Sequence, residues 1–568
     1  MRTANRISIT FLTVATVLLV VSIALLCWVP PVSRDALIHH LAVPKLWIAN
    51  QGMVELPHLP FSYYPMNLDL LYLIPLLFHN DILPKFIHFS FGLLTAFLIC
   101  QYLRSRLRTE DALAGSLIFL STPIIIKLCI TAYVDLGLIF FSFAAILFFF
   151  KWMAGEFRIK HVLACGIMCG LGMGTKYQGL IVLFLIALFI PVVFIRAVPG
   201  NVHNQAKALV YSAIFITTAL IIFSPWMVRN ALWTGNPVHP LFKSHFSKPA
   251  SVSDASPDNT HPDGGQAIVP SKGQAWGHFN IRRYIYNDSG WEILTTPLRI
   301  FFQGRDGHPK YFDGKLNPFL LLLPLLSLIG IRRDDRHICK EKVFLAAFSF
   351  LFLLIVFFRT DMRIRYVAPI LPPLAILSIY GLSNLKKAIA SRTHTEFNSI
   401  LKLVPSLVLA GMLMLNAAYL IGQFSEVDPL AYISGRVDRD TYIARHRPEY
   451  GVIKYANDHL PKESKILAVF LGRRGYYSER DMIFDFSFAS KSVKLTSDLD
   501  RLSIQFDQRG ITHLMIRTDL FTQWINSSAF NDRQREVLKI FLANHTKLIH
   551  AEKGHELYGL VAAPYHLH

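Results

Sequence analysis

The sequence predicts an α-helical polytopic membrane protein that ends in a small α/β domain. Of its 568 residues, 53% are hydrophobic and only 17% are charged, whereas about a quarter of the residues in soluble proteins are charged. Apolar runs recur along the first three quarters of the chain, and several could cross about 30 Å of hydrocarbon. After residue 422, strand-like and helix-like segments alternate instead.

The apolar runs predict about eleven transmembrane helices. They cover residues 7–29, 83–103, 111–129, 134–152, 161–176, 178–196, 207–225, 316–331, 343–358, 366–384 and 400–422. The first run is too long for a signal-peptide core, and Pro30 and Pro31 follow it in place of a small-residue cleavage site. We therefore expect a retained first helix.

Residues 31–80 contain no uninterrupted span, because Pro65, Asn67, Asp69 and Pro75 break their apolar stretch. We expect one or two helices there that lie in the membrane interface. If this segment does not span, every alternate loop between the apolar runs is rich in Lys and Arg, as cytoplasmic loops are. The segments 31–80, 226–315 and 423–568 then lie on the outer face.

The same loops carry much of the formal net charge of +19. The charge therefore reports membrane orientation, and we expect no nucleic-acid partner. Residues 1–422 form the predicted transmembrane domain, whose large outer loop contains a polar stretch at 247–266 that is typical of a mobile loop.

The tail, 423–568, is predicted to be an outer α/β domain. Its strand-like runs are KILAVFL, DMIFDF and THLMIR, and its helix-like segments cover about 448–459 and 531–543. These segments alternate along the chain, which favours a sheet covered by helices.

Ionisable residues collect at the predicted outer boundary of the membrane. They are Asp35, Asp135, Lys176, Arg229, Arg363 and Arg365. Such residues are costly at a membrane boundary when unpaired, and they often mark substrate paths. Cations hold and stabilise a departing phosphate, while a carboxylate removes the proton of an attacking hydroxyl. This set suits transfer from a lipid-linked phosphate donor, and the sequence contains no Walker or GxGxxG motif.

Five motifs give the chain a family resemblance. In order they are RDALIHHLAVPKLW with SYYPMNLDLLY, AYVDLGLIFFSFAAILFF, GLGMGTKYQGLIVL, SPWMVRNALWTGNPVHPLF and RIRYVAPILPPLAIL. The chain resembles the GT-C superfamily of glycosyltransferases that use polyprenyl-phosphate sugars. It is most similar to the bacterial lipid A aminoarabinose transferases and to relatives of protein O-mannosyltransferases. The resemblance covers roughly residues 7–385, and each motif alone is loose.

The resemblance implies a role for each matched residue. Asp35 would be the general base on the acceptor hydroxyl, and Asp135 would orient acceptor or sugar. Arg365 and Tyr366 match an Arg-Tyr pair near the lipid phosphate. The remaining candidates for substrate binding are Lys176, Arg229, Arg363, His40 and Tyr64.

The implied activity is an inverting transfer of a sugar from a polyprenyl-phosphate donor to a lipid, glycan or protein acceptor. It would take place at the outer face of a bacterial cytoplasmic membrane. One departure stands out: the aminoarabinose transferases carry acid-Lys-Pro where this chain has Tyr63-Tyr64-Pro65. A DxD-type metal pair is also missing near Asp135, so we expect neither a metal nor another cofactor.

Each candidate also has a purely structural interpretation. Asp35 would stabilise the first turn of a helix, Asp135 would pair with a Lys or Arg, and Lys176 would snorkel at a helix end. Two other functions would suit a membrane protein of this kind. A lipid-glycan transporter would need polar groups at mid-membrane, and an assembly protein would explain the tail but not the acids and cations.

Overall fold

The computed structural model describes residues 2–198, 200, 202–246, 278–331, 334–392, 401–486, 488, 490, 492, 499–527 and 530–561. The polar stretch 247–266 lies outside them. The chain divides into two compact units, each described here by itself. The membrane unit comprises residues 1–29, 63–242 and 270–433, and the tail unit comprises 30–62, 243–269 and 434–568.

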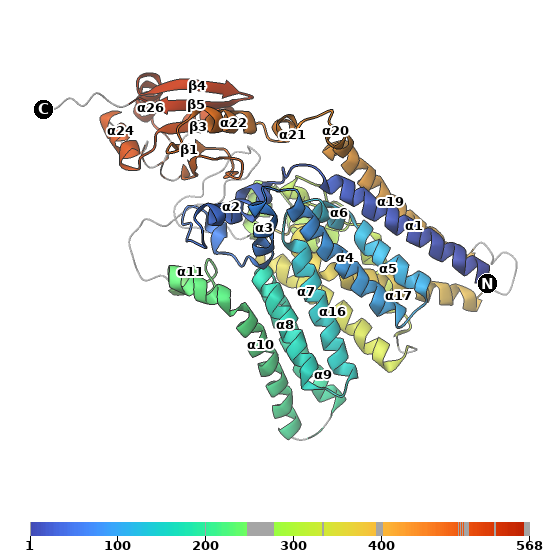
Figure 1. The fold of residues 1–568 in the computed structure, drawn as a ribbon. Helices are drawn as coiled ribbons and strands as arrows, with labels where there is room; N and C mark the ends of the chain where they lie inside the picture. The colour runs from blue at the N-terminus through green and yellow to red at the C-terminus, as the bar shows by residue number, and fades with distance from the viewer. Residues whose placement is uncertain are drawn as a thin grey trace. The chain divides into compact units, whose positions relative to one another are not determined.

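The long apolar helices of the membrane unit show that the chain is a multi-pass membrane protein. Among the described residues, eight helices are long and apolar enough to cross a membrane, or nine if one bent pair is a single span. The eight are Arg6–Cys27 of α1 (Arg2–Cys27), α4 (Leu83–Arg104), α7 (Asp135–Ala154), α9 (Gly179–Ala197), α10 (Val202–Thr234), α16 (Arg336–Arg359), Ile364–Ala390 including most of α17 (Leu371–Arg392), and α19 (Val404–Val427). Figure 1 shows these helices.

The predicted number of eleven spans is not reached by this criterion, because two predicted runs form shorter helices. α8 (Ile159–Thr175) has 17 residues and α15 (Phe319–Ser327) has nine. The second run is shortened because Asn317 and Pro318 precede the helix, and because Gly330 follows it with a positive φ of 70°.

The predicted run 111–129 is bent in the structure. It forms α5 (Thr109–Ser121) and α6 (Pro123–Cys129), which meet at an angle of 66°. Thr122 between them has a ψ of 129°, as expected for a residue that precedes proline. Pro123 therefore ends one helix and begins the next.

The prediction that the run 207–225 ends near Ser224 is wrong, because helix α10 continues beyond it. It runs without a break through Pro225 to Thr234, so Arg229 lies within the helix rather than after it. Its 33 residues measure about 50 Å at 1.5 Å per residue. This exceeds the hydrocarbon thickness of about 30 Å, so at least one end of α10 projects beyond it.

Helix α8 packs against both α7 and α10, as Figure 1 shows. Its glycines permit this approach, because a Cβ on Gly170 would lie 2.6 Å from the carbonyl oxygen of Ala219 in α10. Gly166, one turn earlier, meets Phe215 of α10 in the same way, at 2.9 Å. Small residues four apart commonly bring membrane helices together in this manner.

Shorter helices fill the connections. Within 31–80, the structure has the π-helical turn η1 (Ala36–His40), α2 (Ala42–Ala49), η2 (Pro60–Tyr63) and α3 (Asn67–Leu77). Between α10 and α16 lie α11 (Lys243–Phe246), α12 (His278–Asn280), η3 (Ile281–Ile285), α13 (Gly290–Leu294), α14 (Thr296–Arg299) and η4 (Pro309–Tyr311); η6 (Ile364–Ile370) precedes α17 and α20 (Pro429–Ile433) follows α19. The helices in 31–80 are too short to span, as the interruptions in the sequence indicate.

The tail unit contains a five-stranded mixed sheet in the order β2-β1-β3-β5-β4. Its strands are β1 (Lys465–Val469), β2 (Asp481–Ile483), β3 (His513–Arg517), β4 (Thr546–Glu552) and β5 (His555–Leu560). Its helices are α21 (Arg439–His446), α22 (Tyr450–His459), α24 (Leu499–Gln508), α25 (Thr518–Ile525) and α26 (Asp532–Asn544). β1 pairs in parallel with β2 and β3, while β5 pairs antiparallel with β3 and β4.

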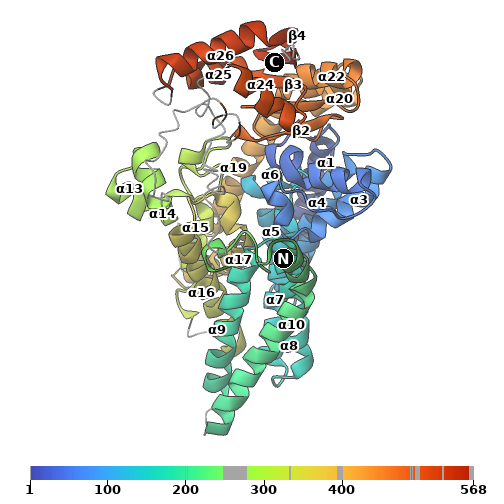
Figure 2. The same ribbon diagram turned by 90° about the vertical axis from the view of Figure 1, so that its left-hand side faces the viewer.

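Helices cover both faces of this sheet (Figure 2). Alternate residues of β1 point to opposite sides. Leu467 and Val469 pack with residues of α24, α25 and α26, whereas Ile466 and Ala468 pack with residues of α22. The three strands and two helices predicted from the sequence are present in the structure, and the hairpin of β4 and β5 is an addition to them.

Candidate active site

Asp135 and Lys176 form a buried ion pair in the membrane unit. Asp135 is the first residue of α7, and Lys176 is the C-cap of α8. The Nζ of Lys176 donates to Oδ1 of Asp135 at 2.7 Å, and the carboxylate side chain is only 1% exposed. The other oxygen, Oδ2, is buried with no hydrogen-bond partner among the described residues. The carboxylate therefore retains capacity to accept a hydrogen bond.

His88 of α4 fixes the start of α7. Its Nδ1 lies 2.9 Å from the carbonyl oxygens of both Leu128 and Thr131, and its Nε2 lies 2.9 Å from the backbone nitrogen of Leu136. These contacts require a proton on Nδ1 and a lone pair on Nε2, which is the neutral imidazole. His88 thus fixes the backbone of the turn before Asp135 by hydrogen bonds to groups on both sides of it.

Arg365 and Tyr366 complete the polar group around this ion pair. The Nζ of Lys176 lies 5.7 Å from the centre of the Tyr366 ring, and the guanidinium of Arg365 lies 5.4 Å from the same ring. Arg365 also lies 5.5 Å from the ring of Tyr133. Two cations therefore flank one phenol ring beside the Asp135 carboxylate, an arrangement that suits an anionic ligand.

A loop from Gly304 to Lys315 holds the segment that carries Arg365. The backbone of Ile364 donates to the carbonyl of Phe312 at 2.9 Å, and that of Ile124 donates to the carbonyl of Lys315 at 3.0 Å. Within the loop, a Cβ on Gly304 would lie 2.4 Å from the carbonyl oxygen of Gly314. Only glycine permits this close approach of the two backbone segments.

Lys127 of α6 forms ion pairs with two carboxylates of this loop, one of which also contacts Arg363. Its Nζ lies 3.0 Å from Asp306 and 3.1 Å from Asp313, while Arg363 lies 3.8 Å from Asp313. Burial alone would raise the pKa of Asp313, but the charges of Lys127 and Arg365 outweigh it and lower the pKa. Asp313 is therefore held as the anion.

A pocket of about 680 Å³ opens beside Asp306. Its lining includes the cations Arg305 and Lys315, the ring of Tyr311, and Tyr419, whose hydroxyl donates to Asp306 at 2.7 Å. Arg305 lies 5.3 Å from the centre of the Tyr311 ring. Lys127 bridges this pocket to Asp313 and so to the Arg363 side of the cluster.

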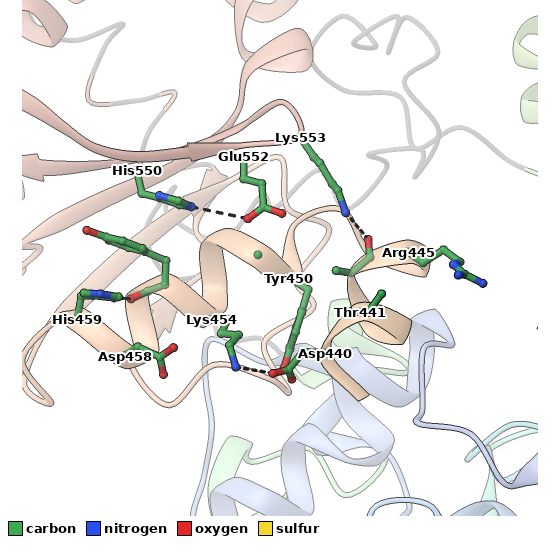
Figure 3. A pocket seen from close by; sticks show the side chains of 13 residues that line it. Asp440, Thr441, Arg445, Tyr450, Lys454, Asp458, His459, His550, Glu552 and Lys553 are labelled. Atoms are coloured by element: carbon green, nitrogen blue, oxygen red, sulfur yellow. Dashed lines mark hydrogen bonds and ion pairs between the residues drawn. The ribbon is translucent and has the colours of Figure 1, made fainter. Parts of the chain in front are cut away.

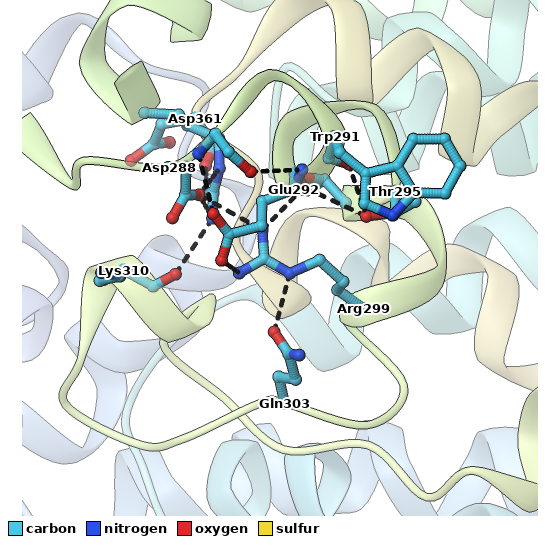
Figure 4. A network of polar contacts seen from close by, with 11 residues as sticks. Asp288, Trp291, Glu292, Thr295, Arg299, Gln303, Lys310 and Asp361 are labelled. Atoms are coloured by element: carbon cyan, nitrogen blue, oxygen red, sulfur yellow. Dashed lines mark hydrogen bonds and ion pairs between the residues drawn. The ribbon is translucent and has the colours of Figure 1, made fainter. Parts of the chain in front are cut away.

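A network of buried charged residues, Arg282, Asp288 and Arg299, is joined to the backbone of the segment that leads to Arg363 and Arg365. Nε and an amino nitrogen of Arg282 lie 3.0 and 2.9 Å from Oδ2 of Asp288, and Arg299 approaches the same oxygen at 3.4 Å. Figure 4 shows Asp288 and Arg299 among the polar groups of this network. Arg282 also donates to the backbone carbonyls of Lys310 and Asp361, each at 3.1 Å. It thereby joins the Gly304–Lys315 loop to the segment that precedes Arg363 and Arg365.

Arg229 and Tyr64 form a second group in the membrane unit. The guanidinium of Arg229 lies between Trp226 and Trp233, at 4.5 and 4.9 Å from their rings, and donates to the carbonyl of Tyr64 at 3.1 Å. One amino nitrogen of Arg229 is buried with no hydrogen-bond partner among the described residues. The Tyr64 ring packs edge-on against Tyr177, the neighbour of Lys176.

Asp35 and His40 belong to the tail unit. Asp35 is the residue before the π-helical turn η1, and His40 is its last residue and is buried. The ring of His40 lies 4.0 Å from that of His39, which stacks on Phe61 at 4.7 Å. His40 therefore contributes to the packing of this loop.

The tail also has a pocket of its own, of about 670 Å³ (Figure 3). Its polar groups bond with one another. Asp440 accepts from the hydroxyl of Tyr450 at 2.7 Å and from Nζ of Lys454 at 2.5 Å, while Lys553 donates to the carbonyl of Ala444. Tyr455 is stacked between two histidine rings. The cluster in the membrane unit is the stronger candidate site, because there Asp135 keeps a buried carboxylate oxygen without a hydrogen-bond partner among the described residues.

Among the residues that the structure describes, no group of three or more His, Cys, Asp or Glu side chains is placed to hold a metal ion.

Comparisons with known proteins show a family match and a shared fold. Residues 65–228 match the model of the dolichyl-phosphate-mannose-protein mannosyltransferase family. The fold matches that of ArnT from Cupriavidus metallidurans in the apo state, with a TM-score of 0.57, 13% identity, and coverage of 98% of this chain and 99% of that one. The chain has the GT-C fold. This confirms the resemblance that the five sequence motifs indicate.

Further solved structures share the GT-C fold. ArnT bound to undecaprenyl phosphate matches with a TM-score of 0.56, 13% identity and 98% coverage of both chains. The oligosaccharyltransferase of Archaeoglobus fulgidus, tethered to an acceptor peptide, matches with a TM-score of 0.52 and 10% identity, over 97% of this chain and 74% of that one. A comparison with curated protein sequences gives no significant match.

Sequence reasoning missed several residues that build the site. They are His88, Lys127, Asp288, Arg282, Arg299, Asp306 and Asp313. Two of these carried a signal: His88 and Lys127 are ionisable residues inside predicted spans, where they are rare. The others lie in an irregular segment without periodicity, where the sequence pattern carries no information about contacts.

Proposed function

We propose that this protein is an integral-membrane glycosyltransferase. It transfers a sugar from a polyprenyl-phosphate donor to a lipid, glycan or protein acceptor at the outer face of a bacterial cytoplasmic membrane. The observation that carries the proposal is the pairing of Lys176 and Arg365 around the Tyr366 ring, beside the buried Asp135. A GT-C fold that has been solved with undecaprenyl phosphate supports the choice of donor.

In this mechanism, the two cations bind the phosphate that links sugar to lipid. The acceptor hydroxyl attacks the anomeric carbon and forms the new glycosidic bond, while the bond from that carbon to the phosphate oxygen breaks. Lys176 and Arg365 stabilise the negative charge that develops on the departing polyprenyl phosphate. Asp35 takes the proton of the attacking hydroxyl. A single displacement of this kind inverts the anomeric centre.

Asp135 has two parts in this proposal. Through Oδ1 it fixes the position of the Lys176 ammonium, and through Oδ2 it accepts a hydrogen bond from a sugar or acceptor hydroxyl. The ion pair of Asp135 with Lys176 would, by itself, also be explained by a purely structural role. The unpartnered buried oxygen favours the binding role, because a buried acceptor is costly to leave unsatisfied.

The positions of these charges favour an enzyme over a transporter. Asp135 begins α7 and Lys176 caps α8, so both lie at helix ends. A transporter of the alternating-access type holds its substrate near the bilayer midplane. The position of both residues at helix ends supports the proposal of a reaction at one face of the membrane.

The direct test is sugar transfer from a labelled polyprenyl-phosphate donor by the detergent-solubilised protein. Asp35→Asn removes the base and is expected to lower kcat by about 100-fold or more, the usual contribution of general base catalysis. Glu463→Gln makes the same chemical change at an exposed site in the tail unit and should retain full activity. Full activity in a folded Asp35→Asn variant would remove Asp35 from the mechanism.

A separate experiment tests the donor site. Lys176→Gln and Arg365→Gln should each weaken binding of a polyprenyl phosphate lacking the sugar, whereas Asp35→Asn should not. Loss of one charge-assisted contact of about 1.5–3 kcal/mol corresponds to roughly a 10- to 150-fold weaker affinity. Unchanged affinity in both variants would place the donor phosphate elsewhere.

A further inference from the structure

The loop that carries Asp35 and the C-terminal domain form one compact unit, although about 400 residues separate them. We propose that the C-terminal domain is a positioning device for this loop: residues of its 447–478 region clamp the backbone on both sides of Asp35. This inference rests on the proposed function, because it gives the domain a role in placing the base.

One side of the clamp acts before Asp35. The hydroxyl of Tyr477 donates to the backbone carbonyl of Pro31 at 2.7 Å, and Nε of Arg447 donates to the carbonyl of Val32 at 2.5 Å. Both acceptors are main-chain oxygens three or four residues from Asp35. The contacts therefore restrain the path of the backbone whatever side chains the loop carries.

The other side acts after Asp35. The backbone nitrogen of Tyr476 donates to the carbonyl of Leu37 at 3.2 Å. From the loop, Nζ of Lys45 donates to the carbonyls of Tyr476 and Ser478, each at 2.8 Å, and lies 5.5 Å from the Tyr476 ring. Asp35 thus lies between two anchored stretches, at the start of a π-helical turn, a feature that often occurs at functional sites.

The clamp is itself anchored to the folded domain. The side-chain amide of Asn457, in α22, donates to the carbonyl of Tyr477 at 2.9 Å, and the Tyr477 ring packs edge-on against Tyr450 of the same helix. Arg474 forms an ion pair with Glu449, immediately before α22. Helix α22 in turn packs on the sheet through its buried residues. A connected path therefore runs from the sheet through α22 and Tyr477 to Pro31.

Positioning matters here because a general base works only within hydrogen-bond distance of the proton that it removes. A misplacement of about 1 Å can lower the rate by about 100-fold. The loop 30–62 contains only short helices, η1, α2 and the start of η2, so its own structure gives limited rigidity. The clamp supplies the restraint that short helices cannot provide.

The test uses the full-length protein and two variants, Tyr477→Phe and Lys45→Met. Tyr477→Phe keeps the ring but removes the hydroxyl that reaches Pro31. The matched control is Tyr558→Phe, which removes a hydroxyl that donates to Glu556 on the same strand of the sheet. Two quantities are measured for each protein: hydrogen exchange of peptides covering residues 30–41, and kcat together with KM for the donor.

Loss of one clamp contact is expected to speed exchange in 30–41 by about fivefold, the effect of one ordinary hydrogen bond. Exchange in the sheet should stay unchanged. We further expect kcat to fall by about tenfold or more with the donor KM unaltered, and the double variant to be slower than either single one. The control should match the wild type in exchange of residues 30–41, in kcat and in KM for the donor.

Each outcome decides a separate claim. Unchanged exchange in both variants overturns the clamp, and faster exchange with full kcat overturns its positioning role. Failure of the proposed function looks different: Asp35→Asn would then retain full activity, while the exchange result would still judge the clamp. A fall in kcat together with disturbed exchange in the sheet would show a general loss of fold, and this too would overturn positioning.

Discussion

Replacing Asp288 by Asn should destabilise the membrane unit more than any matched change in the same network. Asp288 has no exposed side-chain surface, and it is the counter-ion of Arg282 and Arg299, whose side chains are 2% and 10% exposed. An amide in its place leaves two guanidiniums in a buried site without a carboxylate. Removing one partner of a buried ion pair costs about 3–5 kcal/mol.

The control is Glu292→Gln, which makes the same change from carboxylate to amide in the same network. Glu292 is 45% exposed and lies 3.7 Å from Arg299, so water screens this pair and its loss has little effect on stability. Glu292 also closes a capping box with Ser289, and Gln can fill the same position. The control should therefore stay close to the wild type.

The assay follows unfolding of the detergent-solubilised protein at a fixed temperature through the reactivity of its buried thiols. Four suitable cysteines lie in the membrane unit: Cys27, Cys129, Cys165 and Cys169. If half of the 3–5 kcal/mol appears in the unfolding barrier, the rate rises about 10- to 70-fold, since each 1.4 kcal/mol is a factor of ten. The donor KM should rise as well, because Arg282 holds the carbonyl of Asp361 near the cations.

Equal unfolding rates for Asp288→Asn and Glu292→Gln would refute this reasoning. They would mean that the two guanidiniums gain enough hydration in the variant to replace the carboxylate. A faster rate with an unchanged donor KM would keep the stability argument but separate the network from the site.

Three further predictions follow from particular contacts. Lys176→Met leaves the carboxylate of Asp135 buried without its cation, so it should accelerate thiol exposure more than Asp135→Asn does, because Lys176 is 19% exposed and can reach water; equal rates would contradict this. Gly304→Ala should separate the loop from the carbonyl of Gly314 and reduce donor affinity, measured as binding of polyprenyl phosphate, whereas Gly411→Ala in α19, with open space around it, should not. Burial lowers the pKa of His555 in the tail, so the unfolded chain binds a proton that the folded one does not, and stability is lost as the pH falls below about 6.5; the protection of the tail amides, which is the intrinsic exchange rate divided by the observed rate at the same pH, should be lower at pH 5.5 than at pH 7.5, and His555→Gln should reduce this difference.

The sequence predicted the elements whose pattern is local. Strand β1, of five residues, follows from a short continuous apolar run, and helix α22 from helical periodicity over ten residues. The start of α7 at Asp135 lies one residue from the predicted start of the apolar run at residue 134. At this level, one segment of chain contains all the information that its structure requires.

Other features depended on contacts that no local pattern reveals. The hairpin of β4 and β5 turns at Lys553 and Gly554, both with positive φ, yet most of β4 is exposed or half-buried and so lacks a clear apolar face. Helix α10 continues through Pro225, although proline usually interrupts a helix interior. Arg282 donates to the backbone carbonyls of Lys310 and Asp361, which lie 28 and 79 residues further along the chain. A sequence pattern does not show which backbone carbonyl accepts a hydrogen bond.

The composition of the tail unit also affects how the protein is made. Residues 30–62 are synthesised early, but the domain that they contact begins only at residue 434. At about 5–20 residues per second, the loop waits roughly 20–75 s for its partner. During this time Pro31, Val32 and Leu37 lack the contacts that hold their backbone in the finished unit. The segment that carries Asp35 therefore acquires its final structure only when nearly the whole chain has been synthesised.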